Sequence, residues 1–315
     1  MLSLITPAFN EAENLEALHA QVVSTMGTLG QEWEWILVDD HSTDDTFDRI
    51  RTLTSGDARI RGLRLASNSG SHLAITAGLH HARGDVAVVM AADLQDPPET
   101  VGIMLERWRA GAQVVWATRR TRPGDRSHSS FAAAYYWIMR RLVGLTAMPV
   151  RGADFFLVDR IVLEAFARHA EHQVSIFALI TAMGFRQDSV EYDKQLRIAG
   201  RSGWTTTKKV ALVVDSVTAF SALPLRAITG FGVLLVAVGA VCGVWTLAAS
   251  TGGALSGLVS AMAVFAGLQM AALGVVGEYV WRTLELSRRR PAYLIESVAG
   301  LPTVPAGPSG TSKIE

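Results

Sequence analysis

Cysteine is nearly absent from this 315-residue chain, which contains only Cys242. A single cysteine excludes an internal disulfide and a cluster of thiolate metal ligands. An excess of charge is absent too, because 29 Lys and Arg residues balance 29 Asp and Glu residues. Balanced charge gives no general attraction to nucleic acid, so we expect no nucleic-acid partner. The first residues, MLSLITPAFNE, lack a basic leader and the apolar core of a signal peptide, so we do not expect secretion.

One long stretch has no charged residue at all, from residue 227 to residue 277. This length is enough for two membrane-spanning helices of about 20 residues, which we place at about Ile228–Ala249 and Leu258–Val280. A helical hairpin in a soluble core is the alternative, but neither segment has a polar stripe. Small residues in both segments would also allow a homo-oligomer to form through these helices.

Arginines flank the hairpin on both sides, whereas the turn inside it has no positive charge. Arg226 precedes the first helix, and four arginines, Arg282 and Arg288 to Arg290, follow the second. The positive-inside rule then places both termini and the residues before the hairpin in the cytoplasm. We therefore expect a multi-pass membrane protein with both termini in the cytoplasm, and the family resemblance given below implies the bacterial inner membrane.

The first 120 residues alternate apolar runs with amphipathic segments. Helices of 10–15 residues are predicted between the runs, and the first of them is capped by Asn10, with Glu13 at the capping-box position. This alternation predicts an α/β fold in which a mostly parallel sheet has helices on both faces. The predicted strands are Leu2–Thr6, Trp33–Val38, Ile60–Leu65, Asp85–Met90 and Val114–Ala117.

Small and acidic residues follow these strands, in the loops PAFNE, VDDHSTDDT, SNSGS and AADLQD. In a parallel sheet such loops converge at the edge where ligands bind. Asp93, Gln95 and Asp96 offer the oxygen ligands that Mg²⁺ or Mn²⁺ prefers, although acidic residues here can also cap a helix. No GxGxxG or GxxxxGK[ST] motif follows a strand, which argues against a dinucleotide cofactor and against a P-loop ATPase. Acidic strand ends instead suit the ribose, base and metal-bound diphosphate of a nucleotide-sugar.

Four segments, taken in order and spacing, resemble family 2 glycosyltransferases of the GT-A fold. They are PAFNEAENL, ILVDDHSTDDT, NSGSHLAITAGLHHARGDVAVVMAADLQDPPE and GADFFLVDR. Within that family they are similar to polyprenyl-phosphate glycosyltransferases, the relatives of dolichol-phosphate mannose synthase. The resemblance runs from about residue 2 to Pro291 and includes the hairpin. It implies a Rossmann-like GT-A domain, an interfacial amphipathic helix and two transmembrane helices.

The resemblance also implies an activity and a cofactor. The enzyme would transfer a hexose, with inversion, from a nucleoside-diphosphate sugar to a polyprenyl phosphate at the cytoplasmic leaflet of the lipid bilayer. A divalent cation, Mg²⁺ or Mn²⁺, would hold the diphosphate. The residues 1–200 would be the catalytic domain, 201–226 the interfacial segment, 227–281 the hairpin, and 282–315 a cytoplasmic tail that is disordered from about residue 299.

Roles for single residues follow from the matched motifs. Asp154 is the implied catalytic residue and addresses the acceptor, while Asp93 and Gln95 hold the metal. The nucleotide of the donor would contact Pro7, Phe9, Asn10, Glu11, Asp39, Asp40, Asn68, Ala92 and Asp93, and the phosphates and acceptor would contact Arg119, Arg122, Arg197 and Arg201. Asn10, Asp39 and Asp154 have an alternative role as cap or turn residues, and Arg119 and Arg122 could instead belong to a solvated basic loop.

Four positions depart from the family pattern. Ala91 replaces the first carboxylate of the metal loop, and Ser71, followed by His72, replaces a basic residue. Phe156 stands in place of an arginine and Gly203 in place of a lysine. These departures predict a weakly held metal, and they leave open a different donor sugar. Two further alternatives remain: another lipid or glycan as acceptor, and a catalytically degenerate membrane homologue.

Overall fold

The structure is a computed structural model that describes residues 1–120, 155–168, 175–193 and 291–300, with single positions and short runs between 137 and 283. The chain divides into two compact units. The first consists of Met1–Tyr136, Ala147–Trp204 and Pro291–Glu315, and the second of Trp137–Thr146 and Thr205–Arg290. The candidate site lies in the first unit.

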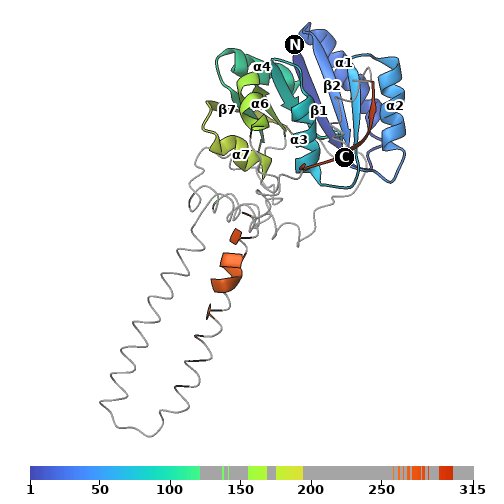
Figure 1. Ribbon diagram of the computed structural model, residues 1–315. Coiled ribbons are helices and arrows are strands. Elements are labelled where there is room, and N and C mark those ends of the chain that lie inside the picture. Colours follow the sequence, from blue (N-terminus) through green and yellow to red (C-terminus); the bar gives the residue numbers. More distant parts are fainter. Residues whose placement is uncertain are drawn as a thin grey trace, which may run out of the picture. The chain divides into compact units, whose positions relative to one another are not determined.

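The described residues of the first unit form an eight-stranded mixed sheet (Figure 1). The strand order is β7-β5-β6-β4-β1-β2-β3-β8. Six strands run in one direction, while β6 and β8 are antiparallel to their neighbours. The strands are β1 (Leu2–Ala8), β2 (Trp33–Asp39), β3 (Ile60–Leu65), β4 (Val86–Val89), β5 (Val114–Arg119), β6 (Phe155–Asp159), β7 (Gln187–Tyr192) and β8 (Ile295–Ala299).

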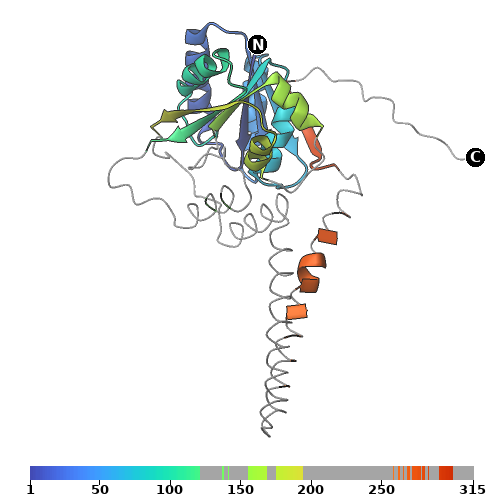
Figure 2. The same cartoon turned by 90° about the vertical axis from the view of Figure 1, so that its left-hand side faces the viewer.

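Helices cover both faces of the sheet, as Figure 2 shows from the side. One face carries α1 (Leu15–Leu29), α2 (Thr46–Gly56) and α4 (Thr100–Arg109). The other carries α3 (Ser71–His81), α6 (Arg160–Ala167) and α7 (Ile176–Ala182). On this second face Gly78 of α3 lies against Ile5, where any side chain at position 78 would clash. The predicted α/β architecture with helices on both faces is therefore confirmed.

The first helix shows how the sequence pattern and the structure agree and differ. Its predicted apolar face is confirmed, since Leu15, Leu18, Val22 and Met26 are buried. The predicted cap is wrong, because α1 begins at Leu15 and has Asn14 at its N-cap position. Asn10 instead adopts a φ of 56°, in the left-handed region, and its side-chain oxygen accepts from the N–H of Thr43.

A buried ionic network lies near the amino ends of the central strands. Glu34 of β2 accepts hydrogen bonds from the Ser3 hydroxyl at 2.6 Å and from the backbone N–H of Arg83 at 2.7 Å. Its second oxygen is 2.6 Å from a guanidinium nitrogen of Arg61 in β3. Burial lowers the pKa of Arg61, and the Glu34 carboxylate raises it in part. The pair thus depends on its own hydrogen bonds rather than on water for its stability.

Three strands have no counterpart in the predicted set, and one of them corrects the predicted tail. Residues 291–300 are not a separate tail, because β8 pairs antiparallel with β3 in the same sheet. Ala299 is the last residue of this strand, and residues from 301 onward lie outside the described part of the chain.

The predicted membrane segments fall almost entirely outside the described residues. This holds for residues 201–226 and for the first predicted span, while the second span is described only at scattered helical positions from 258 onward. Among the residues that the structure describes, no helix is long and apolar enough to cross a membrane.

Candidate active site

The carboxyl ends of β1 to β5 and β7 lie at one edge of the sheet, because these strands run in the same direction. The loops that follow them hold most of the predicted site residues that the structure describes. This edge is the usual ligand-binding position in an open α/β sheet. The topology therefore brings the loops after β1, β2, β3 and β4 to one side of the domain.

The loops after β1 and β2 are joined by hydrogen bonds. The backbone N–H of Asn10 donates to the Ser42 hydroxyl at 2.9 Å, and the Asn10 side-chain oxygen accepts from the N–H of Thr43 at 2.9 Å. The N–H of Glu11 donates to the Thr46 hydroxyl at 2.9 Å. Asn10 and Glu11 therefore hold the two loops in one arrangement.

Asp39, at the end of β2, is completely buried and holds the turn that follows it. One carboxylate oxygen accepts from the N–H of Ser42 at 3.1 Å, and the other is 3.0 Å from a guanidinium nitrogen of Arg64. Arg64 also donates to the Ser42 carbonyl at 3.2 Å. The sequence left two roles open for Asp39, contact with the donor or stabilisation of a turn. The contacts seen here are those of a turn residue.

Asp40 joins the turn after β2 to the loop after β3. Its two oxygens accept from the N–H groups of Ser69, at 2.7 Å, and Gly70, at 2.8 Å. Gly70 has a φ of 90°, which favours glycine. Burial raises the pKa of the Asp40 carboxyl, and the two amide hydrogen bonds counter this only in part. Asn68, in the same loop, is exposed.

Phe9 is the exposed aromatic group of this region, with 44% of its surface accessible. It follows Ala8 at the end of β1, and Pro7 is partly exposed one position earlier. An exposed ring beside a set of fixed polar loops suits stacking on a flat base. The structure therefore brings Pro7, Phe9, Asn10, Glu11, Asp39, Asp40 and Asn68 to adjacent strand ends.

The loop after β4 is compact and largely buried. Ala92 is 2% exposed and Asp93 5% exposed, while Gln95 is partly exposed. An oxygen of Asp93 accepts from the N–H of Gln95 at 3.2 Å, across Leu94 with a φ of 60°. Asp93 and Gln95, the two residues predicted to hold a metal, therefore lie at the two ends of one tight turn.

Asp96 stabilises this loop from within. One of its oxygens accepts from the N–H of Ala91 at 3.2 Å, and the other accepts from the hydroxyl of Tyr192 at 2.6 Å. Asp96 is 1% exposed and Tyr192 lies at the end of β7. The Asp96 side chain thus closes the loop and links it to a distant strand.

A metal ion fits this loop only with help from its substrate. In the described residues no group of three or more His, Cys, Asp or Glu side chains is arranged to hold a metal. Asp93 and Gln95 supply one carboxylate and one amide, which are oxygen ligands suited to Mg²⁺ or Mn²⁺. Diphosphate oxygens and water would have to complete the coordination, as the loss of a carboxylate at Ala91 predicts.

One departure from the family pattern, Phe156, lies in an aromatic cluster with His72, the residue that follows the departure at Ser71. Phe156 is fully buried, with its ring centroid 5.4 Å from that of Trp116 and 5.8 Å from that of Phe177 in α7. His72 packs edge-on against the same Phe177 at 5.1 Å and accepts the N–H of Ile176 at its Nδ1, 3.3 Å away. Burial lowers the pKa of His72 to about 4. Near neutral pH the cluster is therefore uncharged.

The remaining predicted residues lie at or beyond the limits of the description. Arg119 is partly exposed at the carboxyl end of β5, where it pairs with Tyr192 of β7. Asp154, Arg122, Arg197, Arg201 and Gly203 lie outside the described residues. Asp154 immediately precedes β6 in the sequence, and β6 runs beside β4 with Phe156 opposite Val89.

Two charged residues at this edge are additional to the predicted set. They are Arg64, which binds Asp39, and Glu296 of β8, which is 2.9 Å from Arg64. Two arginines, Arg61 and Arg64, stand inside the otherwise apolar run IRGLRL and were a signal, because an arginine in a buried strand needs a partner. No local signal marks Glu296, since its partner is far away in the sequence.

This sheet, with polar loops at the carboxyl ends of its parallel strands, defines a GT-A-type fold. The family model described as glycosyl transferase family 2 matches residues 3–166. The chain belongs to that family and is a glycosyltransferase.

Relatives of known name match nearly the whole chain. An uncharacterised glycosyltransferase of Synechocystis is 32% identical, over 96% of this chain and 97% of its own length. A prophage bactoprenol glucosyl transferase homologue of Escherichia coli is 31% identical, over 94% and 99%. The bactoprenol glucosyl transferase of Shigella phage SfV is 30% identical, over 94% and 98%.

Solved structures agree in fold. Glucosyl-3-phosphoglycerate synthase of Mycobacterium tuberculosis, in complex with Mn²⁺, UDP-glucose and phosphoglyceric acid, matches with a TM-score of 0.50 and 17% identity. The match covers 69% of this chain and 79% of that one. A second mycobacterial protein has a TM-score of 0.52 and 18% identity, over 70% and 74%.

Proposed function

We propose that this glycosyltransferase moves a hexose from a nucleoside-diphosphate sugar to a polyprenyl phosphate, at the cytoplasmic leaflet of the bacterial inner membrane. The observation that carries the proposal is the likeness to bactoprenol glucosyl transferases, which extends over 94% of this chain and so beyond the catalytic domain. The proposed acceptor is a lipid that lies in the bilayer. The enzyme would therefore need a part that binds the membrane.

The nucleoside would bind at the ends of β1, β2 and β3. Phe9 offers an exposed ring for the base, and the loops beside it are held by the hydrogen bonds of Asn10, Asp39 and Asp40. Loops that are already fixed lower the entropic cost of binding. Asn68 is exposed at the same edge and would contact the donor directly.

The diphosphate would lie at the loop after β4. Asp93 and Gln95 would hold a divalent cation there, which neutralises charge on the leaving diphosphate. The Mycobacterium tuberculosis synthase of similar fold carries Mn²⁺ together with UDP-glucose. Arg119 would add positive charge from the end of β5, and we propose that Arg122, Arg197 and Arg201 act on the phosphates of donor and acceptor.

Transfer would proceed with inversion. An oxygen of the acceptor phosphate attacks the anomeric carbon, and the bond from this carbon to the nucleoside diphosphate breaks on the opposite side. The acceptor phosphate is ionised near neutral pH, so Asp154 would orient the attacking group more than it removes a proton. Its place directly before β6 puts it next in sequence to a strand that pairs with β4.

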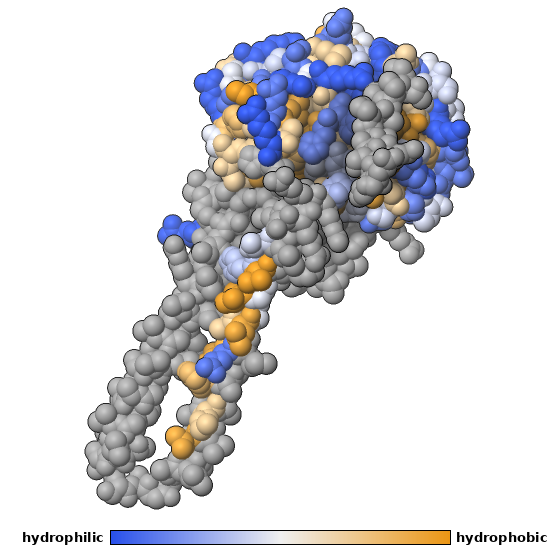
Figure 3. Space-filling model, in the orientation of Figure 1, coloured by the Kyte–Doolittle hydropathy of each residue, from blue (hydrophilic) through white to orange (hydrophobic). Residues whose placement is uncertain are grey.

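Residues 201–281 would attach the enzyme to the membrane. Described helical positions between 258 and 280 expose large apolar side chains, and Figure 3 colours them as hydrophobic. Examples are Leu258, Met262, Leu273 and Val280, each with more than half of its surface accessible. Exposed apolar side chains on one segment indicate an interaction with lipid or with another apolar surface.

The test is an incubation of the full chain in detergent with radiolabelled nucleotide-sugars, Mn²⁺ or Mg²⁺, and undecaprenyl phosphate. Label that becomes soluble in butanol supports the proposal. Label in a different lipid or in a glycan contradicts the proposed acceptor, and no transfer from any donor supports a degenerate homologue. Full activity without any divalent cation would contradict the metal site.

Variants of the same assay address the residues. Asp93→Asn and Asp154→Asn should each lower the rate at least a hundredfold, because each removes a charge from the reacting region. Asp48→Asn is the matched control, since Asp48 is an exposed carboxylate on α2 that, within the described part of the chain, pairs only with Arg51, at 3.4 Å. Unchanged turnover in the first two variants would refute both roles.

A further inference from the structure

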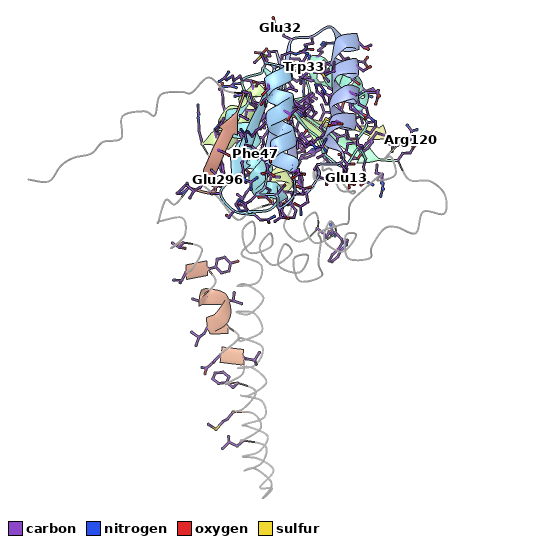
Figure 4. The ribbon with its side chains drawn as sticks, turned by 90° about the vertical axis from the view of Figure 1, so that its right-hand side faces the viewer. Glu13, Glu32, Trp33, Phe47, Arg120 and Glu296 are labelled. Carbon is purple, nitrogen blue, oxygen red and sulfur yellow. The ribbon has the colours of Figure 1, made fainter. Side chains whose placement is uncertain are left out.

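Glu296 lies on β8, the strand that the chain forms only after the predicted membrane segment. Figure 4 shows it beside Phe47 of α2. Its carboxylate is 2.9 Å from Nε of Arg64 and 3.5 Å from Nδ1 of His41, and about half of its side chain is exposed. β8, the last strand in the sequence, thus contacts the loop after β2 through Glu296 and His41.

The pairing of β8 with β3 is irregular at Glu296, as in a β-bulge. Arg64 is paired with Ser297, but its neighbour Leu65 is paired with Ile295, so Glu296 is the extra residue. In a regular ladder Glu296 would oppose Leu65 and lie on the other face of the sheet, because side chains alternate. Bulges redirect side chains in this way and are frequent next to active sites.

The guanidinium of Arg64 is held between two carboxylates. Its NH1 atom is 3.0 Å from the buried Asp39, its NH2 atom donates to the Ser42 carbonyl, and its Nε donates to Glu296. The guanidinium carbon also lies 5.5 Å from the centre of the Phe47 ring. Each nitrogen of the planar group therefore has one acceptor, which fixes its orientation.

The series of contacts continues into the candidate donor loops. Ser42, which Arg64 and Asp39 hold by its carbonyl and its N–H, accepts the N–H of Asn10 at its hydroxyl. The Asn10 side chain in turn accepts the N–H of Thr43. Glu296 is thus joined to the loop after β1 through Arg64 and Ser42.

We propose that Glu296 is a positioning residue for the donor site, which acts through Arg64 on the turn from Asp39 to Ser42. The inference rests on the proposed function, because it assumes that this turn helps to bind the nucleotide of the donor. Glu296 touches no substrate in this account. Its loss leaves Arg64 with one acceptor fewer and lets the turn adopt other conformations, which weakens donor binding without changing the chemical step.

The experiment compares Glu296→Ala and Glu296→Gln with the wild-type full chain in detergent. Binding of UDP-glucose and of GDP-mannose in the presence of Mn²⁺ is measured by calorimetry, and KM and kcat are measured in the transfer assay. We expect Glu296→Ala to raise the Kd and the KM for the donor about threefold, since a half-exposed ion pair has a modest effect. The change to Gln should be smaller, and kcat and the KM for the acceptor should stay constant.

Two controls separate positioning from a loss of stability. Glu164→Ala removes a carboxylate of similar exposure that is 3.2 Å from Arg160 on α6, and it should leave the donor Kd unchanged. Arg64→Ala should weaken donor binding more, and adding Glu296→Ala to it should have no further effect. Additive effects would show that Glu296 does not act through Arg64.

Three other results would each overturn one or both of the proposals. A lower melting temperature of Glu296→Ala with an unchanged donor Kd would make Glu296 a purely structural residue and overturn the proposal. Wild-type protein that binds a donor but transfers nothing to undecaprenyl phosphate would refute the proposed acceptor, while the binding data would still test Glu296. Wild-type protein that binds no nucleoside-diphosphate sugar, in a screen extended beyond these two probes, would overturn both proposals.

Discussion

Protonation of His72 should destabilise the catalytic domain below neutral pH. The Nδ1 atom of His72 accepts the N–H of Ile176, so it carries no proton, and the ring packs against Phe177. Burial lowers the pKa of His72 to about 4, from 6.5 in the unfolded chain. A lowered pKa contributes stability that is complete above pH 6.5 and is lost as the pH falls toward 4.

The size of the effect follows from the shift. A difference of about 2.5 pKa units corresponds to about 3 kcal/mol, and about 2 kcal/mol of this should already be lost at pH 5. For a domain of this size that loss lowers the melting temperature by about 4–8 °C. The variant His72→Asn keeps an acceptor near the N–H of Ile176 but has no group that titrates in this range.

The assay compares thermal unfolding of wild-type and His72→Asn protein at pH 7 and pH 5, followed by tryptophan fluorescence. Trp116 belongs to the same aromatic cluster, so its emission reports on the region. Other titrating groups contribute equally to both proteins and cancel in the difference. Wild-type protein should lose about 4–8 °C more than the variant. Equal losses in the two proteins would refute the assignment of a neutral His72.

Three further predictions concern other parts of the catalytic domain. Glu34→Ala should lower the free energy of unfolding by about 3–5 kcal/mol in urea denaturation, since it leaves Arg61 buried without its partner. Tyr192→Phe should lower the free energy of unfolding by about 1–3 kcal/mol and lower activity, because Asp96 loses the 2.6 Å bond that closes the loop after β4. Unchanged activity would contradict a role of this bond in holding the proposed metal site. Ala91→Asp should lower the Mn²⁺ concentration for half-maximal activity about tenfold, whereas an unaltered requirement would place the metal elsewhere.

The parts of the fold that the sequence predicts well are those with a local signal. β1 to β5 are apolar runs next to amphipathic helices, and their predicted bounds agree with the structure to within two residues. β7 has the sequence QDSVEY, which is mostly polar because the strand lies at the edge of the sheet. β8 escaped prediction because its pairing with β3 depends on residues more than 200 positions away. No window of sequence contains both partners.

The candidate site divides in the same way. Its position at the ends of β1 to β4 could be predicted, because a run of strand–helix units sends every strand end to the same edge. The division of roles among neighbouring acidic residues could not. Asp93 and Asp96 lie in the same loop, yet only the contact with Tyr192, 96 residues further on, shows that Asp96 closes the loop.

The sequence by itself determined the α/β class, the family and the set of loops that form the site, because periodicity and motifs are local properties. Only the tertiary structure decided which partner each side chain meets. It placed Phe156 in an aromatic cluster, Arg64 against Asp39, and Glu296 against Arg64 across 232 residues. The physical reason is that a hydrogen bond or ion pair depends on distance in space, and the folded sheet, with its bulge at Glu296, sets that distance.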